Sequence, residues 1–232
     1  MILRQLFDHD TYTYTYLLAA EHGGKAIIID PVNTHVEMYI ELCKQLNLEL
    51  AYAIDTHTHA DHITAIGDLR DATSCVSMVG NESMADCVSS KFSDKDVIEA
   101  GNLKLVVLHT PGHTDDSYSF YLEHNGFKAI FTGDTLLIRG SGRTDFQNGN
   151  AHEQYDSLFQ KILKLPEDTL VYPAHDYKGW TVSTIKEERD WNPRLQIDSV
   201  EAYSELMANL KLANPKMMDI AVPANQSCGK ID

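Results

Sequence analysis

An α/β fold is what the sequence predicts, and three observations support it. Short β-rich runs alternate with segments whose apolar residues recur at helical spacing, and a polar loop follows nearly every strand-like run. The 232 residues are 43% hydrophobic and 23% charged, as in ordinary soluble globular proteins. No fixed-period repeat or low-complexity linker interrupts the chain. We therefore expect a single domain over residues 1–232 that ends in a short helical extension.

The N-terminal part predicts two antiparallel strands, a helix and a third strand. Residues 11–16 alternate threonine with tyrosine at period two, and residues 25–30 form a short β-rich run. Thr34 and Glu37 form a capping box, after which apolar residues recur at helical spacing. Residues 48–54 form the next strand and lead directly into a histidine-rich loop. We expect one aromatic stripe of the first strand to pack in the core, namely Tyr12, Tyr14 and Tyr16.

The same succession of strand, polar loop and helix continues toward the C-terminus. Further strands are predicted at residues 75–79, 103–108, 118–122, 128–131 and 169–172. Further helices are predicted at residues 63–70, 83–92, 152–163, 182–190 and 199–210. Layered α/β folds bind ligands at the ends of their strands, so the loops that follow these strands are where a functional site is expected.

The charge of the chain excludes some partners. Thirty-four Asp and Glu residues against 19 Lys and Arg give a net charge of −15. A field of this sign repels phosphate backbones and anionic membrane surfaces, so we expect neither nucleic acid nor a membrane as a partner. An anionic substrate would have to be attracted by a local cluster of arginine and lysine or by the charge of a metal ion.

Cysteine usage and the absence of targeting patterns bear on location. The cysteines include no C-x-x-C pair, so neither a disulfide framework nor a thiolate zinc site is expected; they are Cys43, Cys75, Cys87 and Cys228. No apolar run is long enough to span a bilayer, and the first twenty residues lack a signal or transit pattern. We therefore expect a cytoplasmic protein, or one already processed, in a reducing compartment.

Candidate metal ligands gather at the ends of the predicted strands. The segment H-x-H-x-D-H places four of them within six residues, at His57, His59, Asp61 and His62. Taken alone, this loop could equally hold histidines that cap backbone carbonyls. Three more candidates follow three other strands, in loops that contain Gly or Pro; they are His113, Asp134 and His175. Together the seven residues predict a metal site.

This combination of motifs resembles the metallo-β-lactamase superfamily over residues 56–176. The resemblance implies an αβ/βα four-layer sandwich, in which two sheets pack face to face with helices outside, and a metal site at one edge. It also implies two metal pockets bridged by one carboxylate: His57, His59 and His113 form the first, Asp61, His62 and His175 the second, and Asp134 bridges them. The scaffold supports hydrolases and oxidoreductases alike, so other loops must indicate the reaction.

Four further segments are similar to those of the glutathione persulfide dioxygenases, also called sulfur dioxygenases; they are residues 133–147, 172–179, 187–194 and 221–225. The glutathione thioesterases of the glyoxalase II branch share the metal cluster but usually have a longer helical C-terminal region, whereas this chain ends at Asp232. The chain departs from the family where Asp115 and Asp116 replace the usual Pro-Gly after His113. That departure concerns the loop beside the metal and leaves the ligands intact.

The resemblance implies one Fe(II) per chain, held by His57, His113 and Asp134 as catalytic centre. Two histidines and one carboxylate on one face of an octahedron leave three positions for substrate sulfur and dioxygen. The remaining candidates would orient these ligands or hold a second metal; they are His59, Asp61, His62 and His175. The alternative is a dizinc hydroxyacylglutathione hydrolase, a thioesterase with two Zn(II). A metal-binding protein without turnover is the third interpretation.

The implied reaction converts glutathione persulfide, dioxygen and water to glutathione and sulfite. The resemblance places four residues at the glutathione moiety: Arg143, Tyr177, Arg194 and Asn225. Arginine suits this task because its planar fork grips a carboxylate with two hydrogen bonds. On composition alone each arginine would more often form a surface salt bridge. Asp176 is expected to cap its loop and Cys228 to be a buried or pocket-wall cysteine, while a homodimer and a sulfurtransferase partner are left open.

Overall fold

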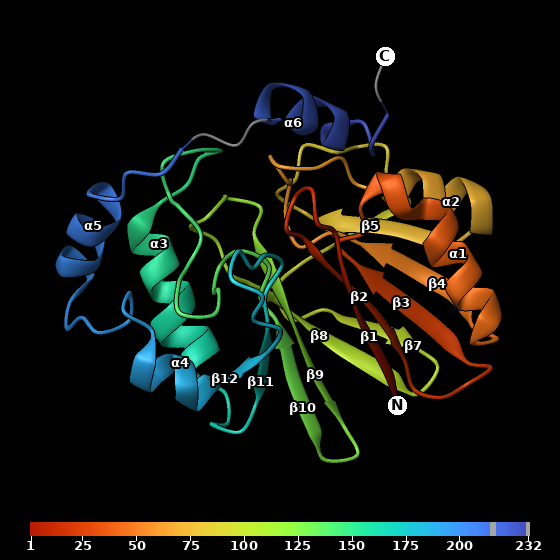
Figure 1. Cartoon of the computed structure of the whole chain (residues 1–232), viewed down its shortest axis with the longest axis horizontal. Helices are drawn as coiled ribbons and strands as arrows, with labels where there is room; N and C mark the ends of the chain where they lie inside the picture. Colours follow the sequence, from red (N-terminus) through yellow and green to blue (C-terminus); the bar gives the residue numbers. More distant parts are fainter. Residues whose placement is uncertain (214–216, 231–232) are drawn as a thin grey trace. The chain divides into compact units, whose positions relative to one another are not determined.

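The computed structural model describes residues 1–213 and 217–230, and these fall into two compact units (Figure 1). The first unit comprises Met1–Phe92, Val97–Lys104 and the C-terminal segment, and the second comprises Ser93–Asp96 and Leu105–Ala213. Each unit has its own hydrophobic core between a mixed β-sheet and helices. The single domain expected over residues 1–232 stays a prediction.

The first sheet is six-stranded, with the strand order β1-β2-β3-β4-β5-β6. Its strands are β1 (Ile2–Phe7), β2 (Tyr14–Ala19), β3 (Lys25–Ile29), β4 (Glu49–Ile54), β5 (Val76–Gly80) and β6 (Ser90–Phe92). The first three pair antiparallel and the others parallel. Strands β3 and β4 can pair in parallel because a helix connects them, as a crossover between parallel strands requires. The predicted antiparallel pair of residues 11–16 and 25–30 is confirmed as β2 and β3, although β1 was not predicted.

Two helices cover one face of this sheet, α1 (Val36–Gln45) and α2 (Ile66–Thr73) (Figure 1). Helix α1 buries Tyr39 and Cys43 in the core of the first unit, and α2 buries Ile66 and Leu69. The predicted capping box is wrong, because α1 begins after His35 and no side chain caps it. A third helix, α6 (Met218–Gln226), was not predicted; it packs its Ala221 and Ala224 against Ile63.

The second sheet has the strand order β12-β11-β10-β9-β8-β7. Its strands are β7 (Val97–Ala100), β8 (Leu103–His109), β9 (Tyr118–His124), β10 (Phe127–Phe131), β11 (Leu170–Tyr172) and β12 (Ser183–Thr184). Strands β8 to β10 pair antiparallel, and β10 pairs with β11 in parallel. Strands β8, β9, β10 and β11 were predicted from the sequence, whereas the edge strands β7 and β12 were not.

The helices of the second unit form its core together with the inner strands. They are α3 (Ala151–Asp156), α4 (Ile185–Trp191) and α5 (Val200–Ala208). Helix α3 continues through one π turn and one 3-10 turn to Lys164, and its Leu158 and Ile162 are fully buried. Asn150, Thr184 and Ser199 cap the three helices with their side chains, as expected for Asn, Thr and Ser at an N-cap. The helices predicted here are confirmed.

Two local predictions are wrong. Residues 83–92 form turns and then strand β6 instead of a helix, because β6 completes the edge of the first sheet by pairing with β5. Tyr12 is 45% exposed with a φ of +61°, so it lies before the strand and outside the core, whereas Tyr14 and Tyr16 are buried as predicted. Among the described residues, no helix is long and apolar enough to cross a membrane.

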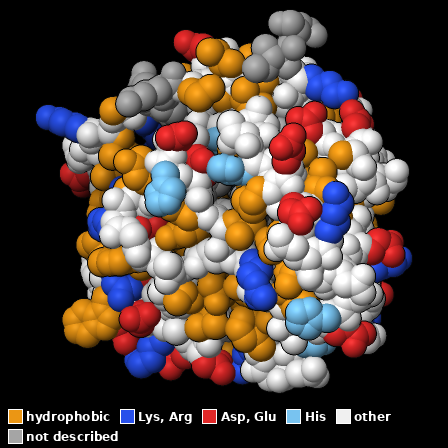
Figure 2. All heavy atoms as spheres, turned by 45° about the vertical axis from the view of Figure 1, so that its right-hand side comes forward, with side chains coloured by type: hydrophobic (Ala, Val, Ile, Leu, Met, Phe, Trp, Pro, Cys, Tyr) orange, Lys and Arg blue, Asp and Glu red, His pale blue; other side chains and the backbone are white. Residues whose placement is uncertain are grey.

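The face drawn in Figure 2 shows acidic, basic and apolar side chains interspersed. Its Lys and Arg side chains occur singly instead of forming a broad basic patch.

Candidate metal centre

The histidine loop of the first unit follows directly after strand β4, as the sequence predicts. His57, His59 and His62 are all buried, and the ring of His59 contacts the rings of the other two. The ring centroids of His57 and His59 are 4.1 Å apart, and those of His59 and His62 are 4.2 Å apart. Asp61 accepts a hydrogen bond on Oδ2 from Nδ1 of His62 at 3.1 Å. The loop therefore gathers three imidazoles and one carboxylate in the first unit.

Asp30, a buried carboxylate that was not predicted from the sequence, forms hydrogen bonds with two residues of this loop. Its Oδ1 accepts from the backbone N of Thr56 at 2.7 Å and lies 3.1 Å from Nε2 of His59. Its Oδ2 accepts from the Thr56 hydroxyl at 3.0 Å. Burial raises the pKa of Asp30, although the nearby His57 and the bonds from Thr56 oppose the rise. Asp30 directly follows β3 and has a φ of +51°. The sequence Ile-Ile-Ile-Asp-Pro, in which an acidic residue ends a strand-like run, is the signal that could have identified it.

A chain of hydroxyl groups extends from His62 toward the surface of the first unit. Thr13 Oγ1 lies 3.3 Å from Nδ1 of His62, and Thr11 Oγ1 lies 2.8 Å from Thr13 Oγ1. Thr11 also donates to Asp8 Oδ2 at 2.5 Å, and Asp8 Oδ1 lies 2.8 Å from Nε2 of His35. Burial would raise the pKa of Asp8, but the bonds from Thr11 and His35 outweigh it and hold this pKa below its usual value.

Asn225 of helix α6 braces the histidine loop from the C-terminal side. Its Nδ2 donates to the carbonyl oxygens of His59 and His62, each at 2.9 Å. Its Oδ1 accepts from the backbone N of Thr64 at 2.9 Å. The amide thus joins three backbone groups of one loop, and it is 5% exposed. The predicted contact of Asn225 with substrate stays a prediction.

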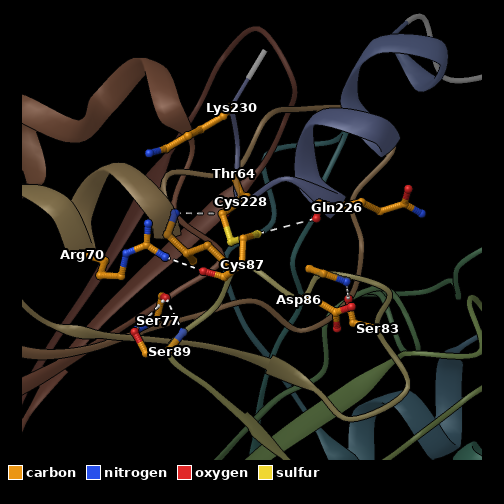
Figure 3. The surroundings of a disulfide bond; sticks show 12 residues. Thr64, Arg70, Ser77, Ser83, Asp86, Cys87, Ser89, Gln226, Cys228 and Lys230 are labelled. Carbon is orange, nitrogen blue, oxygen red and sulfur yellow. Dashed lines mark hydrogen bonds between the residues drawn. A yellow bond between two sulfur atoms is a disulfide. The ribbon is translucent and has the colours of Figure 1, made fainter. Parts of the chain in front are cut away.

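The sequence-based expectation for the cysteines is wrong, because Cys87 and Cys228 form a disulfide (Figure 3). Their Cα atoms are 6.0 Å apart, although the residues are separated by 141 positions. Cys228 is buried, as expected, but it forms a disulfide and is not a free thiol. Gly67 permits the close approach, because a Cβ at this position would come within 2.3 Å of the Cys228 carbonyl oxygen. No spacing signal in the sequence announces this pair, since only the fold brings α6 to residue 87.

In the second unit, three candidate ligands converge from three strand ends. His113 follows β8, Asp134 follows β10 and His175 follows β11. Nδ1 of His175 lies 2.6 Å from Asp134 Oδ1, while Nε2 of His113 lies 3.7 Å from Asp134 Oδ2. Nδ1 of His113 lies 2.8 Å from the carbonyl oxygen of Arg143. A carbonyl only accepts hydrogen bonds, so Nδ1 of His113 bears the proton and its Nε2 keeps a lone pair.

The segment that provides this carbonyl packs tightly against the ligands. Gly142 donates its N–H to the Asp134 carbonyl at 2.6 Å, and a Cβ on it would come within 2.3 Å of that oxygen and 2.7 Å of His113 Nδ1. Gln154 donates to the Gly142 carbonyl at 3.2 Å and accepts from the Tyr203 hydroxyl at 2.8 Å. Burial raises the pKa of Tyr203 to about 12, so it stays a neutral donor.

The segment 187–194 supports the same loop from the other side. Glu188 is fully buried; its Oε1 accepts from Arg139 Nη1 and its Oε2 from the Arg139 backbone N at 2.8 Å. Asn192 donates to the carbonyls of Leu137 and Gly140 at 3.3 and 2.9 Å, and to Glu188 Oε2 at 2.8 Å. Much of this motif therefore shapes the loop of residues 137–142.

The two arginines predicted to bind substrate differ in their surroundings. Arg143 forms a bidentate pair with Asp145 at 2.6 and 2.8 Å and lies over the ring of Phe146. Arg194 Nη1 donates to the carbonyl and hydroxyl of Ser141, and burial lowers the pKa of its guanidinium. Among the described residues, no carboxylate pairs with Arg194. Arg143 is therefore already paired with a carboxylate of its own loop, whereas Arg194 bonds to a carbonyl and a hydroxyl.

The loop after β11 carries the other predicted contact residue. Tyr177 is 64% exposed, and its ring stacks parallel to that of His175 at a centroid distance of 6.3 Å. Asp176 accepts from the backbone N–H groups of Lys178 and Trp180 at 2.8 and 2.7 Å, which confirms it as the cap of this loop. Lys178 Nζ lies 5.0 Å from the Trp180 ring.

The aspartates that replace the usual Pro-Gly also bind within the second unit. Asp116 Oδ1 accepts from the Thr114 hydroxyl at 2.6 Å, and Asp115 Oδ2 accepts from Asn148 at 2.8 Å. Both carboxylates thus accept hydrogen bonds from side chains of the second unit.

Comparisons with known proteins agree with this arrangement. The family model described as Metallo-beta-lactamase superfamily matches residues 10–86 and 88–175. The chain is 46% identical to human "Persulfide dioxygenase ETHE1, mitochondrial" over 230 residues, which cover 99% of this chain and 89% of the human protein. It is 37% identical over 175 residues to a probable hydroxyacylglutathione hydrolase of Schizosaccharomyces pombe, covering 75% of this chain and 66% of that protein.

A solved structure extends the likeness to the whole fold. The crystal structure of ETHE1 from Myxococcus xanthus matches with a TM-score of 0.94 and 49% sequence identity, and covers 99% of this chain and 100% of that one. The two mixed sheets with their helices are those of the metallo-β-lactamase fold, as the motifs predicted. The chain therefore belongs to the metallo-β-lactamase superfamily and, within it, to the persulfide dioxygenase family.

Proposed function

We propose that this persulfide dioxygenase holds one Fe(II) through His57, His113 and Asp134 and oxidises glutathione persulfide. The reaction is glutathione persulfide + O₂ + H₂O → glutathione + sulfite + 2 H⁺. Membership of the persulfide dioxygenase family over nearly the whole chain is the observation that carries the proposal. The donor set supports the metal, because two imidazoles and one carboxylate are typical of Fe(II) oxygenases that keep open positions.

The hydrogen bonds around the three proposed ligands agree with this role. His113 Nδ1 donates to the Arg143 carbonyl, so Nε2 is the nitrogen that keeps a lone pair for a metal. Nδ1 of His57 lies 2.9 Å from the Thr56 hydroxyl, which leaves Nε2 of His57 for the same purpose. Asp134 uses Oδ1 toward His175 and turns Oδ2 toward His113. Each ligand is thus oriented by a partner and retains one donor atom.

Fe(II), when bound, would supply adjacent open positions where the persulfide sulfur and dioxygen meet. The protein's own residues would position the substrate and the ligands. Arg194 would receive a carboxylate of the glutathione moiety, because it lies partly buried beside Ser141 without a carboxylate partner among the described residues. Arg143 and the exposed Tyr177 are proposed as further contacts with glutathione, and Asn225 would act through the histidine loop that it braces.

The other four candidates are proposed as residues that orient the ligands. His175 bonds to Asp134, His59 lies against Asp30, and His62 pairs with Asp61. Such partners typically change metal affinity or activity by about 10- to 100-fold when they are removed. A dizinc hydroxyacylglutathione hydrolase is kept as second candidate, because a relative described as a probable hydroxyacylglutathione hydrolase shares 37% identity. A cytoplasmic location, a homodimer and a sulfurtransferase that supplies substrate stay predictions.

One experiment separates the two candidates. The protein is purified anaerobically, iron and zinc are counted per chain, and oxygen uptake with glutathione persulfide is compared with hydrolysis of S-lactoylglutathione. We expect one iron and oxygen uptake in the wild type. His57→Ala should lose iron and activity, whereas His175→Ala should keep iron and lose roughly 10- to 100-fold in activity. His152→Ala, an exposed histidine, is the matched control. Two zinc ions with thioester hydrolysis would overturn the proposal.

A further inference from the structure

The disulfide of the first unit, drawn in Figure 3, joins one exposed and one buried cysteine. Cys87 lies in an exposed turn before β6, whereas Cys228 is 1% exposed in the turn after α6. Thiol–disulfide exchange depends on which sulfur an attacking thiolate can reach. A dissolved thiol would therefore attack Cys87, and Cys228 would be the leaving group.

The described part of the C-terminal segment makes a small apolar cluster and an exposed ion pair besides its hydrogen bonds to the histidine loop. The apolar cluster of α6 comprises Ala221, Ala224 and Met217 against Ile63. Lys230 pairs with Asp71 at 2.9 Å, but both side chains are about half exposed and water weakens such a pair. Cys228 has a φ of +57°, a left-handed conformation that is unfavourable for a residue with a side chain. The disulfide adds a covalent link between this segment and residue 87 of the same unit.

The same segment carries the brace of the histidine loop. Asn225 lies three residues before Cys228 and bonds to His59 O, His62 O and Thr64 N. Directly after Cys228, a Cβ at Gly229 would come within 2.1 Å of the Thr64 carbonyl oxygen, so the backbone of this turn rests on the loop. The turn at Cys228 thus lies between two contacts with the histidine loop and its following residues, one at Asn225 and one at Gly229.

We propose that the Cys87–Cys228 pair is a thiol-exchange site at which a low-molecular-weight thiol opens the disulfide and releases the brace on the histidine loop. In the first step the thiolate bonds to Cys87 Sγ, the Cys87–Cys228 bond breaks, and Cys228 leaves as a thiolate that takes up a proton. A second thiol then attacks the mixed disulfide, which yields the oxidised small thiol and a Cys87 thiol. Two electrons thus pass to the protein.

Glutathione is a suitable thiol of this class, because the proposed reaction releases it. The effect on catalysis therefore rests on the proposed function, whereas the exchange itself does not. Cys43 and Cys75 provide internal controls, since both are buried and burial raises the pKa of each, that of Cys43 to about 11. Thiols of this kind react slowly.

Mass spectrometry tests the site of exchange. The protein is incubated with reduced glutathione, and free thiols are then blocked with N-ethylmaleimide before digestion. We expect glutathione on Cys87 and N-ethylmaleimide on Cys228, with Cys43 and Cys75 unmodified until the protein is denatured. Glutathione on Cys228 with none on Cys87, or no exchange at either position, would overturn the proposed site.

Amide hydrogen exchange tests the link to the histidine loop. The reporter is the backbone N–H of Thr64, which donates a hydrogen bond to Asn225 Oδ1. We expect its exchange to be at least about tenfold faster after reduction, whereas the amide of Ile130 in β10 should not change. Cys87→Ala should show the fast exchange without added thiol, and Cys75→Ala should behave like the wild type.

Equal protection of Thr64 in the oxidised protein, the reduced protein and Cys87→Ala would overturn the proposal. Oxygen uptake with glutathione persulfide is measured on the same samples, and we expect the oxidised form to be the more active. Because the exchange measurement needs no turnover, a protein that consumes no oxygen would refute the proposed function alone.

Discussion

Glu188 offers the sharpest test of how the loop of residues 137–142 is held. Its carboxylate is fully buried and accepts four hydrogen bonds, from the Arg139 guanidinium, the Arg139 backbone N, Ser183 and Asn192. Replacing it with alanine leaves these donors without their acceptor and leaves a partly buried guanidinium without its main counter-charge. Breaking one side of a buried ion pair costs about 3–5 kcal/mol, so we expect Glu188→Ala to lower the free energy of unfolding by that amount.

The neighbouring residue provides the matched control. Glu187 lies on the same helix and reaches the same guanidinium at 3.3 Å, but its side chain is half exposed. Exposed pairs contribute about 0–1 kcal/mol, so Glu187→Ala should change the free energy of unfolding by less than about 1 kcal/mol. Reversible urea unfolding of the two variants and the wild type, followed by circular dichroism, measures both values. Equal losses in the two variants would refute the argument from burial.

Two further predictions concern recognition and acid stability. Arg194→Ala should raise KM for glutathione persulfide at unchanged iron content, by the equivalent of about 2 kcal/mol for a charge-assisted contact. The control is Arg189→Ala, which removes an arginine paired with Glu167 and should leave KM unchanged. Unchanged KM in both variants would count against the assignment of Arg194. Asp8→Asn should be less stable than the wild type at neutral pH, because the lowered pKa of Asp8 stabilises the fold above about pH 4. The difference in stability, measured by thermal unfolding, should shrink as the pH falls below that value. A difference that persists at low pH would contradict this prediction.

The candidate ligands were predictable from the sequence because each follows directly after a strand. The run from His57 to His62 is continuous, and His113, Asp134 and His175 each lie within a few residues of a strand end. Strand periodicity and Gly or Pro turns are local signals, so they can be read before the fold is known. The α/β class and most of the helices and strands followed for the same reason.

The errors arose where neighbours distant in sequence decide the local structure. Residues 83–92 have helical spacing, yet they end as strand β6 because the edge of β5 offers backbone partners. Helix α6 was not predicted because it contains Pro223, and its position depends on Ile63 and on the disulfide. Propensity is a weak guide when tertiary contacts supply more free energy than the local preference.

The sequence by itself determined the chemistry of the candidate ligands, namely the imidazole and carboxylate groups from His57 to His62 and at His113, Asp134 and His175. Only the tertiary structure decided how those groups are supported. Asp30 under His59, Asn225 across the histidine loop and the Cys87–Cys228 bond join positions between 29 and 166 residues apart. Hydrogen bonds and disulfides act over a few ångströms of space and leave no periodic pattern along the chain, so they become visible only when the chain is folded.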